Sequence, residues 1–121
     1  MPIAPAPLEE AAPRFSWPLQ GARTASLKGT RIRAARGSAV TAAADGRVAF
    51  EDAAMAGYGR VVIVEHAQGF ATVYAGVGEI LAPLGATVRA GETIARAGDS
   101  QIYFEIRRHD EAVDPAAILQ R

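Results

Sequence analysis

Two apolar segments joined by a tight turn place the strongest constraint on the fold of this chain. Residues 60–66, RVVIVEH, contain four consecutive β-branched side chains, and residues 70–75, FATVYA, follow the turn signal Gln68-Gly69. Runs of β-branched residues bounded by glycine predict strands, and a short connection makes them antiparallel neighbours. Because residues 61–64 include no polar side chain, we expect them to form a central strand that is covered on both faces.

Short strands separated by turns are predicted along most of the remaining chain. They are expected at 38–44 and 47–50, which Asp45-Gly46 would join in a tight turn, at 85–95 as a glycine-spaced pair, and at 101–107. A single helical turn is expected after Pro115. The pattern is typical of a mainly β fold, built as an antiparallel sheet or barrel.

The segment 101–107 has two chemically different faces. Its residues divide into the apolar set Ile102, Phe104 and Ile106 and the polar set Gln101, Tyr103, Glu105 and Arg107. Successive side chains of a strand point to opposite sides, so the apolar set is expected in the core. The polar set is either an ordinary exposed face or a partner-binding face, since Tyr and Arg are enriched at binding hot spots.

Length, charge and cysteine content exclude several classes of protein. A chain of 121 residues corresponds to one domain, and the Ala- and Pro-rich residues 1–14 are predicted to be a linker before a domain at 15–121. The 13 basic and 13 acidic side chains cancel, which argues against a nucleic-acid partner. The lack of cysteine excludes disulfides, thiolate metal sites and cysteine nucleophiles. No membrane span or signal peptide is visible, so the chain is expected to be cytosolic or a piece of a secreted protein.

A search for catalytic groups in the sequence returns no complete set. His66 ends an apolar strand and is expected to be structural, while His109 lies in a polar turn and is expected to be solvated. A catalytic zinc site needs three protein ligands and an open position, and the spacing of the two histidines does not provide one. No nucleophile elbow or phosphate-binding loop is present.

Several motifs that occur in order along the chain are together specific for one family. They are WPL at 17–19, GSAV at 37–40, AADGRV at 43–48, GYGRVVIVEH at 57–66, TVYA at 72–75, VRAGETI at 88–94 and YFEI at 103–106. Across residues 15–120 the set resembles the LytM domain, the lysostaphin-type zinc metallopeptidase domain. YFEIRR at 103–108 with AVDP at 112–115 is most similar to EnvC-type activators of cell-wall amidases. The resemblance implies an antiparallel, barrel-sandwich-like β-sheet with a groove over the sheet.

The positions at which active members of this family hold zinc and catalytic histidines carry other residues in this chain. Leu27 and Arg31 stand at the positions of the His-x-x-x-Asp pair, and Gln101 and Tyr103 at those of the His-x-His pair. Gly76 stands where a further catalytic histidine follows the middle strand. The resemblance therefore implies a pseudo-metallopeptidase, with no metal, no other cofactor and no catalytic residue.

The function implied by the resemblance is activation of another enzyme. EnvC-type domains bind periplasmic N-acetylmuramoyl-L-alanine amidases and displace a helix that blocks the amidase zinc site, which promotes septal peptidoglycan hydrolysis in cell division. The resemblance further implies a periplasmic location and an upstream coiled coil that connects to a division-site membrane complex. The signal and coiled-coil regions are expected to lie outside these residues, and peptidoglycan itself is a further expected partner.

A partner-binding groove is predicted from the strand periodicity and the positions of the replaced ligands. Its expected residues are Tyr103, Arg107, Tyr74, Glu105, Val61, Lys28, Arg31 and Ile32. The 101–107 residues share one face, Tyr74 lies two residues before Gly76, and Val61 is either groove floor or core. Lys28, Arg31 and Ile32 would form the opposite wall.

Three alternatives remain open from the sequence. One is an active metallopeptidase with unconventional ligands drawn from His66, His109 or carboxylates. Another is a peptidoglycan-binding module without an amidase partner. The third is a biotinyl or lipoyl carrier, suggested by the glycine-spaced residues 85–98, although the only lysine, Lys28, lies outside that segment.

Overall fold

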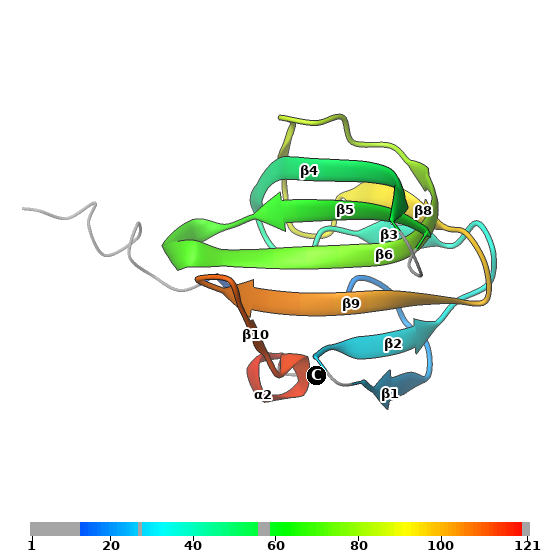
Figure 1. Ribbon diagram of the computed structural model, residues 1–121, viewed down its shortest axis with the longest axis horizontal. Coiled ribbons are helices and arrows are strands. Elements are labelled where there is room, and N and C mark those ends of the chain that lie inside the picture. The colour runs from blue at the N-terminus through cyan, green and yellow to red at the C-terminus, as the bar shows by residue number, and fades with distance from the viewer. Residues whose placement is uncertain (1–12, 27, 56–58, 120–121) are drawn as a thin grey trace, which may run out of the picture.

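The computed structural model describes residues 13–26, 28–55 and 59–119, and these are mostly β (Figure 1). The strands are β1 (Arg23–Ala25), β2 (Thr30–Arg33), β3 (Ala39–Thr41), β4 (Gly46–Met55), β5 (Gly59–Glu65), β6 (Phe70–Ile80), β7 (Thr87–Val88), β8 (Thr93–Ala97), β9 (Gln101–Arg108) and β10 (Glu111–Val113). A 3-10 turn, η1 (Ala67–Gly69), joins β5 to β6, and the short helix α2 (Pro115–Ile118) follows β10. None of the helices described has the length and apolar character required to cross a membrane.

All ten described strands belong to one hydrogen-bonded sheet, and every strand pair in it is antiparallel. The order across the sheet is β1-β2-β9-β6-β5-β4-β7, with β10 paired to the outer part of β9. The strands β3 and β8 pair with each other, and β8 also pairs with β6. Figure 1 shows β3 and β8 behind the front sheet, so the fold has two layers. The predicted mainly β, antiparallel architecture is confirmed.

The hydrophobic core lies between these two layers. On β9, Ile102, Phe104 and Ile106 are at most 1% exposed, as their alternation predicts. They pack in one cluster with Val62 of β5 and Ile94 of β8. Each such large apolar side chain contributes roughly 1.5–3 kcal/mol through its removal from water.

The predicted hairpin across Asp45-Gly46 is wrong. β3 pairs with β8, whereas β4 pairs with β5 and β7. Between β3 and β4 the chain leaves the sheet, and the three alanines 42–44 are buried in the core. The Asp45 carboxylate accepts a hydrogen bond from the backbone N–H of Ala90 at 2.8 Å, which ties this crossing to the segment between β7 and β8.

A chain of hydrogen bonds crosses the core face of β6, and we call it the inner network. His66 Nδ1 lies 2.6 Å from the Asp45 carbonyl oxygen, and His66 Nε2 lies 2.8 Å from the Thr72 hydroxyl. That hydroxyl is 2.6 Å from the Tyr74 hydroxyl, which accepts from the backbone N–H of Ala43 at 2.9 Å. Burial lowers the pKa of His66 and raises the pKa of Tyr74 to about 12. His66 is a structural residue, as the sequence predicts.

The beginning of the described chain is held against the core. Phe15 is 8% exposed, and its ring packs edge-on against His66 and Phe70 at centroid distances of 5.4 and 5.3 Å. Residues 1–12 lie outside the described residues, so the linker at 1–14 and the domain boundary at 15 stay predictions. His109 is exposed, as expected, in the turn between β9 and β10.

Candidate functional site

A groove lies on the outer face of the large sheet, opposite the core face of β9, and we call it the polar groove. It has a volume of about 500 Å³. The predicted residues that line it are Lys28, Arg31, Gly76, Gln101, Tyr103, Glu105 and Arg107. They come from β9, from its two neighbours β2 and β6, and from the turn before β2.

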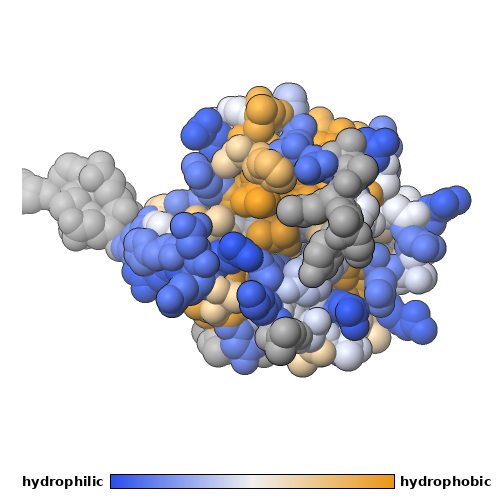
Figure 2. Space-filling view, viewed as in Figure 1, coloured by the Kyte–Doolittle hydropathy of each residue, from blue (hydrophilic) through white to orange (hydrophobic). Residues whose placement is uncertain are grey.

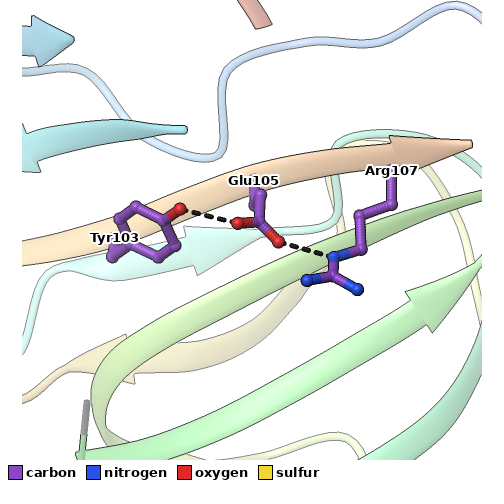
Figure 3. A network of polar contacts seen from close by, with 3 residues as sticks. All are labelled: Tyr103, Glu105 and Arg107. Atoms are coloured by element: carbon purple, nitrogen blue, oxygen red, sulfur yellow. Dashed lines mark hydrogen bonds and ion pairs between the residues drawn. The ribbon is translucent and has the colours of Figure 1, made fainter. Parts of the chain in front are cut away.

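Three groove side chains of β9 form a hydrogen-bonded set that we call the outer network. Glu105 is only 5% exposed, and it accepts a hydrogen bond from the Tyr103 hydroxyl at Oε2 (2.6 Å) and from Arg107 Nε at Oε1 (2.7 Å; Figure 3). The hydrogen bond from Arg107 to Glu105 raises the pKa of the guanidinium group. Because the bond uses Nε, the Nη1 and Nη2 atoms lie beyond it on a guanidinium group that lines the groove (Figure 3).

The same sheet face becomes apolar beyond β9. The register opposes Phe50 to Ile63, Ile63 to Val73, and Val73 to Glu105, and opposed residues of antiparallel strands share a face. We call Phe50, Ile63 and Val73 the apolar strip. Ile63 and Val73 line a hollow of about 210 Å³ with the outer network. Figure 2 shows hydrophobic residues gathered in the middle of this face with hydrophilic residues around them.

Val61 lies on the groove side, one of the two placements that the sequence leaves open. It is 1% exposed, it opposes Ala75 of β6, and both line the same apolar hollow. The next residue, Val62, belongs to the core cluster instead. The core face of the apolar run in β5 is covered as predicted, whereas Ile63 on the outer face is half-buried and lines the hollow, so the predicted cover on both faces is wrong.

The positions predicted to have replaced zinc ligands and catalytic histidines come together in space. Arg31, Gly76, Gln101 and Tyr103 are distant in sequence, yet all four line the polar groove. Tyr103 opposes Arg31 on β2 and Ala75 on β6. The fifth position, residue 27, lies outside the described residues.

The predicted placement of Tyr74 in the groove is wrong. Tyr74 is fully buried in the core, where its ring packs against Phe104 at a centroid distance of 5.5 Å. Gly76 explains the error: Val61 opposes Ala75 but Arg60 opposes Val77, so Gly76 is an extra residue in β6. Its φ of 83° identifies a β-bulge of the glycine type. Because a bulge shifts the alternation by one, residues 74 and 76 do not share a face.

The predicted placement of Ile32 in the groove wall is also wrong. Ile32 is fully buried, opposes Ile102 and belongs to the core cluster. Arg31 and Ile32 are consecutive in β2, and consecutive side chains of a strand point to opposite faces. Arg31 lines the groove, so Ile32 has to point into the core.

Several contributors to this face are absent from the sequence-based prediction. Ser26 and Ala75 line the polar groove, and Phe50 extends the face through its pairing with Ile63. Gly29 makes room for the tyrosine, because a side chain there would lie 2.9 Å from the Tyr103 hydroxyl oxygen. The place of Ala75 on this face could be predicted, because it directly precedes the replaced position 76. The place of Phe50 could not, because it depends on the register of three neighbouring strands.

The groove residues do not fit the zinc ion that active members of the family are expected to hold at this place. Arg31 brings a permanent positive charge, and the Tyr103 hydroxyl and both Glu105 oxygens are engaged with one another and with Arg107. Within residues 13–26, 28–55 and 59–119, no three His, Asp or Glu side chains lie close enough together to hold a metal ion. The described side chains are suited to hydrogen bonding and charge recognition rather than to zinc coordination.

Comparison with known proteins agrees with this fold. Residues 25–115 match peptidase family M23. The murein hydrolase activator EnvC of Escherichia coli strain K12 is 42% identical over 114 residues, which cover 89% of this chain and 26% of that protein. The cell division protein DipM of Caulobacter vibrioides strain NA1000 is 33% identical over 129 residues, covering 89% and 21%. The catalytic domain of lysostaphin from Staphylococcus simulans superposes with a TM-score of 0.69 at 18% identity, covering 88% of each chain.

This chain is therefore a LytM-type domain that belongs to peptidase family M23. It spans about a quarter of the length of EnvC, the relative with which it shares 42% identity, and about a fifth of DipM. The likeness to lysostaphin concerns the fold alone.

Proposed function

We propose that this domain binds an N-acetylmuramoyl-L-alanine amidase through the polar groove and activates it for septal peptidoglycan hydrolysis, without hydrolysing peptidoglycan itself. The observation that carries the proposal is the composition of the groove. Arg31, Gly76, Gln101 and Tyr103 line it together, and the resemblance implies that these positions hold metal ligands and catalytic histidines in active members of the family. Arginine and tyrosine in a groove are suited to hold a partner segment.

The relatives support an activator role. EnvC is named a murein hydrolase activator, and DipM is named a cell division protein. Both names describe proteins several times longer than this chain, so the activity and its partner are part of our proposal. Because peptidoglycan lies outside the cytoplasmic membrane, the proposed site of action is the periplasm. The connection to a division-site membrane complex, through a coiled coil beyond these residues, belongs to the same proposal.

Activation is proposed to act through the conformational equilibrium of the amidase. If a helix of the amidase blocks its own active site, a domain that binds only the unblocked form shifts the population toward that form. Turning a mostly blocked enzyme into a mostly open one requires a preference for the open form of roughly 10⁴-fold. The groove therefore has to make several good contacts with the amidase and not merely tether it.

The test is dye release from labelled sacculi by the amidase of the source organism, with and without this domain. We expect release to rise strongly only when both proteins are present. Arg31→Ala is expected to reduce the rise, whereas Arg89→Ala, which changes an exposed arginine near β7, is the matched control and should keep it. Release that is unchanged by the domain would contradict the proposal.

Two further outcomes separate the alternatives. Dye release by the domain alone, together with stoichiometric zinc after purification without chelators, would establish a metallopeptidase with unconventional ligands. Sedimentation of the domain with sacculi in the absence of amidase, without any gain in dye release, would establish a wall-binding module. Either result would replace the activator proposal.

A further inference from the structure

The edge of β4 that faces away from β5 is paired over only part of its length. β7 pairs with the first two residues of β4, and Val48 continues the pairing because its N–H donates to the Ala86 carbonyl and its carbonyl accepts from the Gly85 N–H. Within the part of the chain that the structure describes, no strand pairs with this edge along residues 49–51. Backbone groups on such an edge are a template for an added strand.

A hollow of about 550 Å³ opens beside this stretch, between β4 and the end of β6, and we call it the acidic hollow. Its described lining contains three carboxylates, Glu51, Asp52 and Glu79, and one cation, Arg60, which leaves a formal charge of −2. Glu79 also contacts Arg96 at 3.9 Å, on the exposed surface outside this lining. The net charge of the whole chain is zero, so the acidic hollow is a local concentration of negative charge.

Glu51 is the carboxylate that most needs a donor. It opposes Val62, which belongs to the core cluster, so its side chain points to the side of β4 that faces the second layer. Its Oε2 atom is buried and has no hydrogen-bond partner among the described residues. A buried carboxylate oxygen without a donor is unfavourable, and a cationic group placed in the acidic hollow would satisfy it.

Apolar side chains border the same hollow. Leu81 lines it and is 40% exposed. Leu84 is 64% exposed and lies between Pro83, which lines the hollow, and Gly85, which is bonded to β4. Lysine and arginine suit such a surface, because their aliphatic stems pack on apolar groups while their charged ends reach a carboxylate.

The charges disfavour a second copy of this chain at the edge of β4. Antiparallel pairing of two β4 edges would bring the Glu51 and Asp52 carboxylates of both copies together, and like charges on neighbouring strands are destabilising. Charge complementarity favours a basic segment of another protein instead.

We propose that the free edge of β4 binds an extended basic segment of a partner protein, which adds to the sheet as a further strand. The backbone of the segment pairs with residues 49–51, and its lysine or arginine side chains reach Glu51 and Glu79 across Leu81. This surface is separate from the polar groove, because β5 and β6 lie between β4 and β9 and the two hollows share no described lining residue (Figure 1). The inference therefore does not depend on the proposed amidase activation.

Two synthetic peptides of about six residues, the usual length of a strand, test the charge preference. One alternates valine with lysine, and the other alternates valine with glutamate. Amide NMR of the isotope-labelled chain measures each affinity and locates the binding surface. We expect the lysine peptide to bind about tenfold more tightly, a factor that corresponds to about 1.4 kcal/mol, and to shift the amides of residues 49–51. Equal affinities, or shifts confined to the polar groove, would overturn the inference.

A matched pair of carboxylate variants tests the acidic hollow itself. Glu51→Gln is expected to weaken binding of the lysine peptide about fivefold, which corresponds to about 1 kcal/mol. Glu111→Gln removes an exposed carboxylate from β10, outside the acidic hollow, and should leave the affinity unchanged. The same loss in both variants would reduce the effect to general attraction between opposite charges and would overturn the site.

Backbone methylation separates strand addition from attraction between side chains. Along an extended peptide the N–H groups of alternate residues point to opposite edges, so methylating the valine nitrogens blocks one edge and methylating the lysine nitrogens blocks the other. We expect one of these two peptides to lose binding and the other to keep it. Undiminished binding of both would exclude strand addition. A dimer of the chain alone that protects the amides of residues 49–51 would identify a second copy as the occupant and overturn the proposed partner.

Discussion

The two faces of strands β6 and β9 each carry a polar network centred on a tyrosine, and the networks differ in charge and exposure. Tyr74 on the core face is fully buried among uncharged groups, whereas Tyr103 on the outer face is half-buried beside Glu105 and Arg107. Both tyrosines sit in the same sheet, and their rings lie on opposite sides of it. The comparison separates side chains that stabilise the fold from side chains that remain available for a partner.

In the inner network, every side-chain hydrogen-bond donor has an acceptor within the protein. The Asp45 carbonyl only accepts, so His66 Nδ1 carries the hydrogen and Nε2 accepts from Thr72. The Thr72 hydroxyl in turn accepts from Tyr74, whose oxygen accepts from the Ala43 N–H. The donors and acceptors therefore follow one consistent order from Tyr74 to Asp45. A hydrogen-bond network that is satisfied inside the core contributes to stability.

In the outer network, the protein provides acceptors for only some of the hydrogen-bond donors. Glu105 is satisfied by two donors, but Arg107 uses a single nitrogen for that purpose, and its side chain is 39% exposed. A guanidinium group has five N–H donors. The remaining donors face a groove, so this network is suited to recognition more than to stability.

The largest expected difference between the faces is in the cost of removing each tyrosine. Tyr74→Ala should lower the free energy of unfolding by about 3–5 kcal/mol, because it leaves a cavity in the core and an unpaired Ala43 N–H. Tyr103→Ala should cost about 1 kcal/mol but abolish amidase activation. Urea denaturation and dye release measure the two effects. Similar losses of stability in both variants would remove the distinction.

A smaller effect is expected from the charge pair of the outer network. Arg107→Met should lower the free energy of unfolding by roughly 1–3 kcal/mol, because it leaves the buried Glu105 carboxylate without its compensating donor. Adding Glu105→Gln should restore part of that stability and should not restore activation. A double-mutant cycle in urea measures the coupling. Additive changes would mean that Glu105 does not depend on Arg107.

The smallest expected effect is the pH dependence of stability that His66 contributes. Its pKa is lowered below the ordinary value of 6.5, mainly by burial and against the opposing effect of the Asp45 carbonyl. As the pH falls below about 6.5, the unfolded chain binds a proton that the folded protein resists, so stability decreases. Urea midpoints at pH 8 and 5.5 measure the decrease.

Substitution of His66 provides the control for this pH effect. His66→Gln should flatten the dependence between pH 8 and 5.5, although it lowers stability at both values. An undiminished slope in His66→Gln would assign the titration to another group.

The sequence by itself determined the local geometry of single strands. Alternation in 101–107 separates Phe104, which is buried, from Tyr103, which lines the groove, because a strand has a period of two residues. The glycine-bounded run in β5 and the turn at Gln68-Gly69 likewise predict the β5–β6 pair. The ordered motifs were sufficient to identify the family, because each of them marks a turn or a strand of the same sheet.

Only the tertiary structure decided how the strands are aligned, and the placement of two side-chain groups depends on that alignment. The bulge at Gly76 places this glycine on the groove face while Tyr74 faces the core, and the pairing of β4 with β5 brings Phe50 onto the same face as the polar groove. Both placements depend on the register between neighbouring strands. That register is set by the hydrophobic surfaces that pack together across the sheet. A one-residue shift in register exchanges the two faces of a strand, and no pattern within a single strand records that shift.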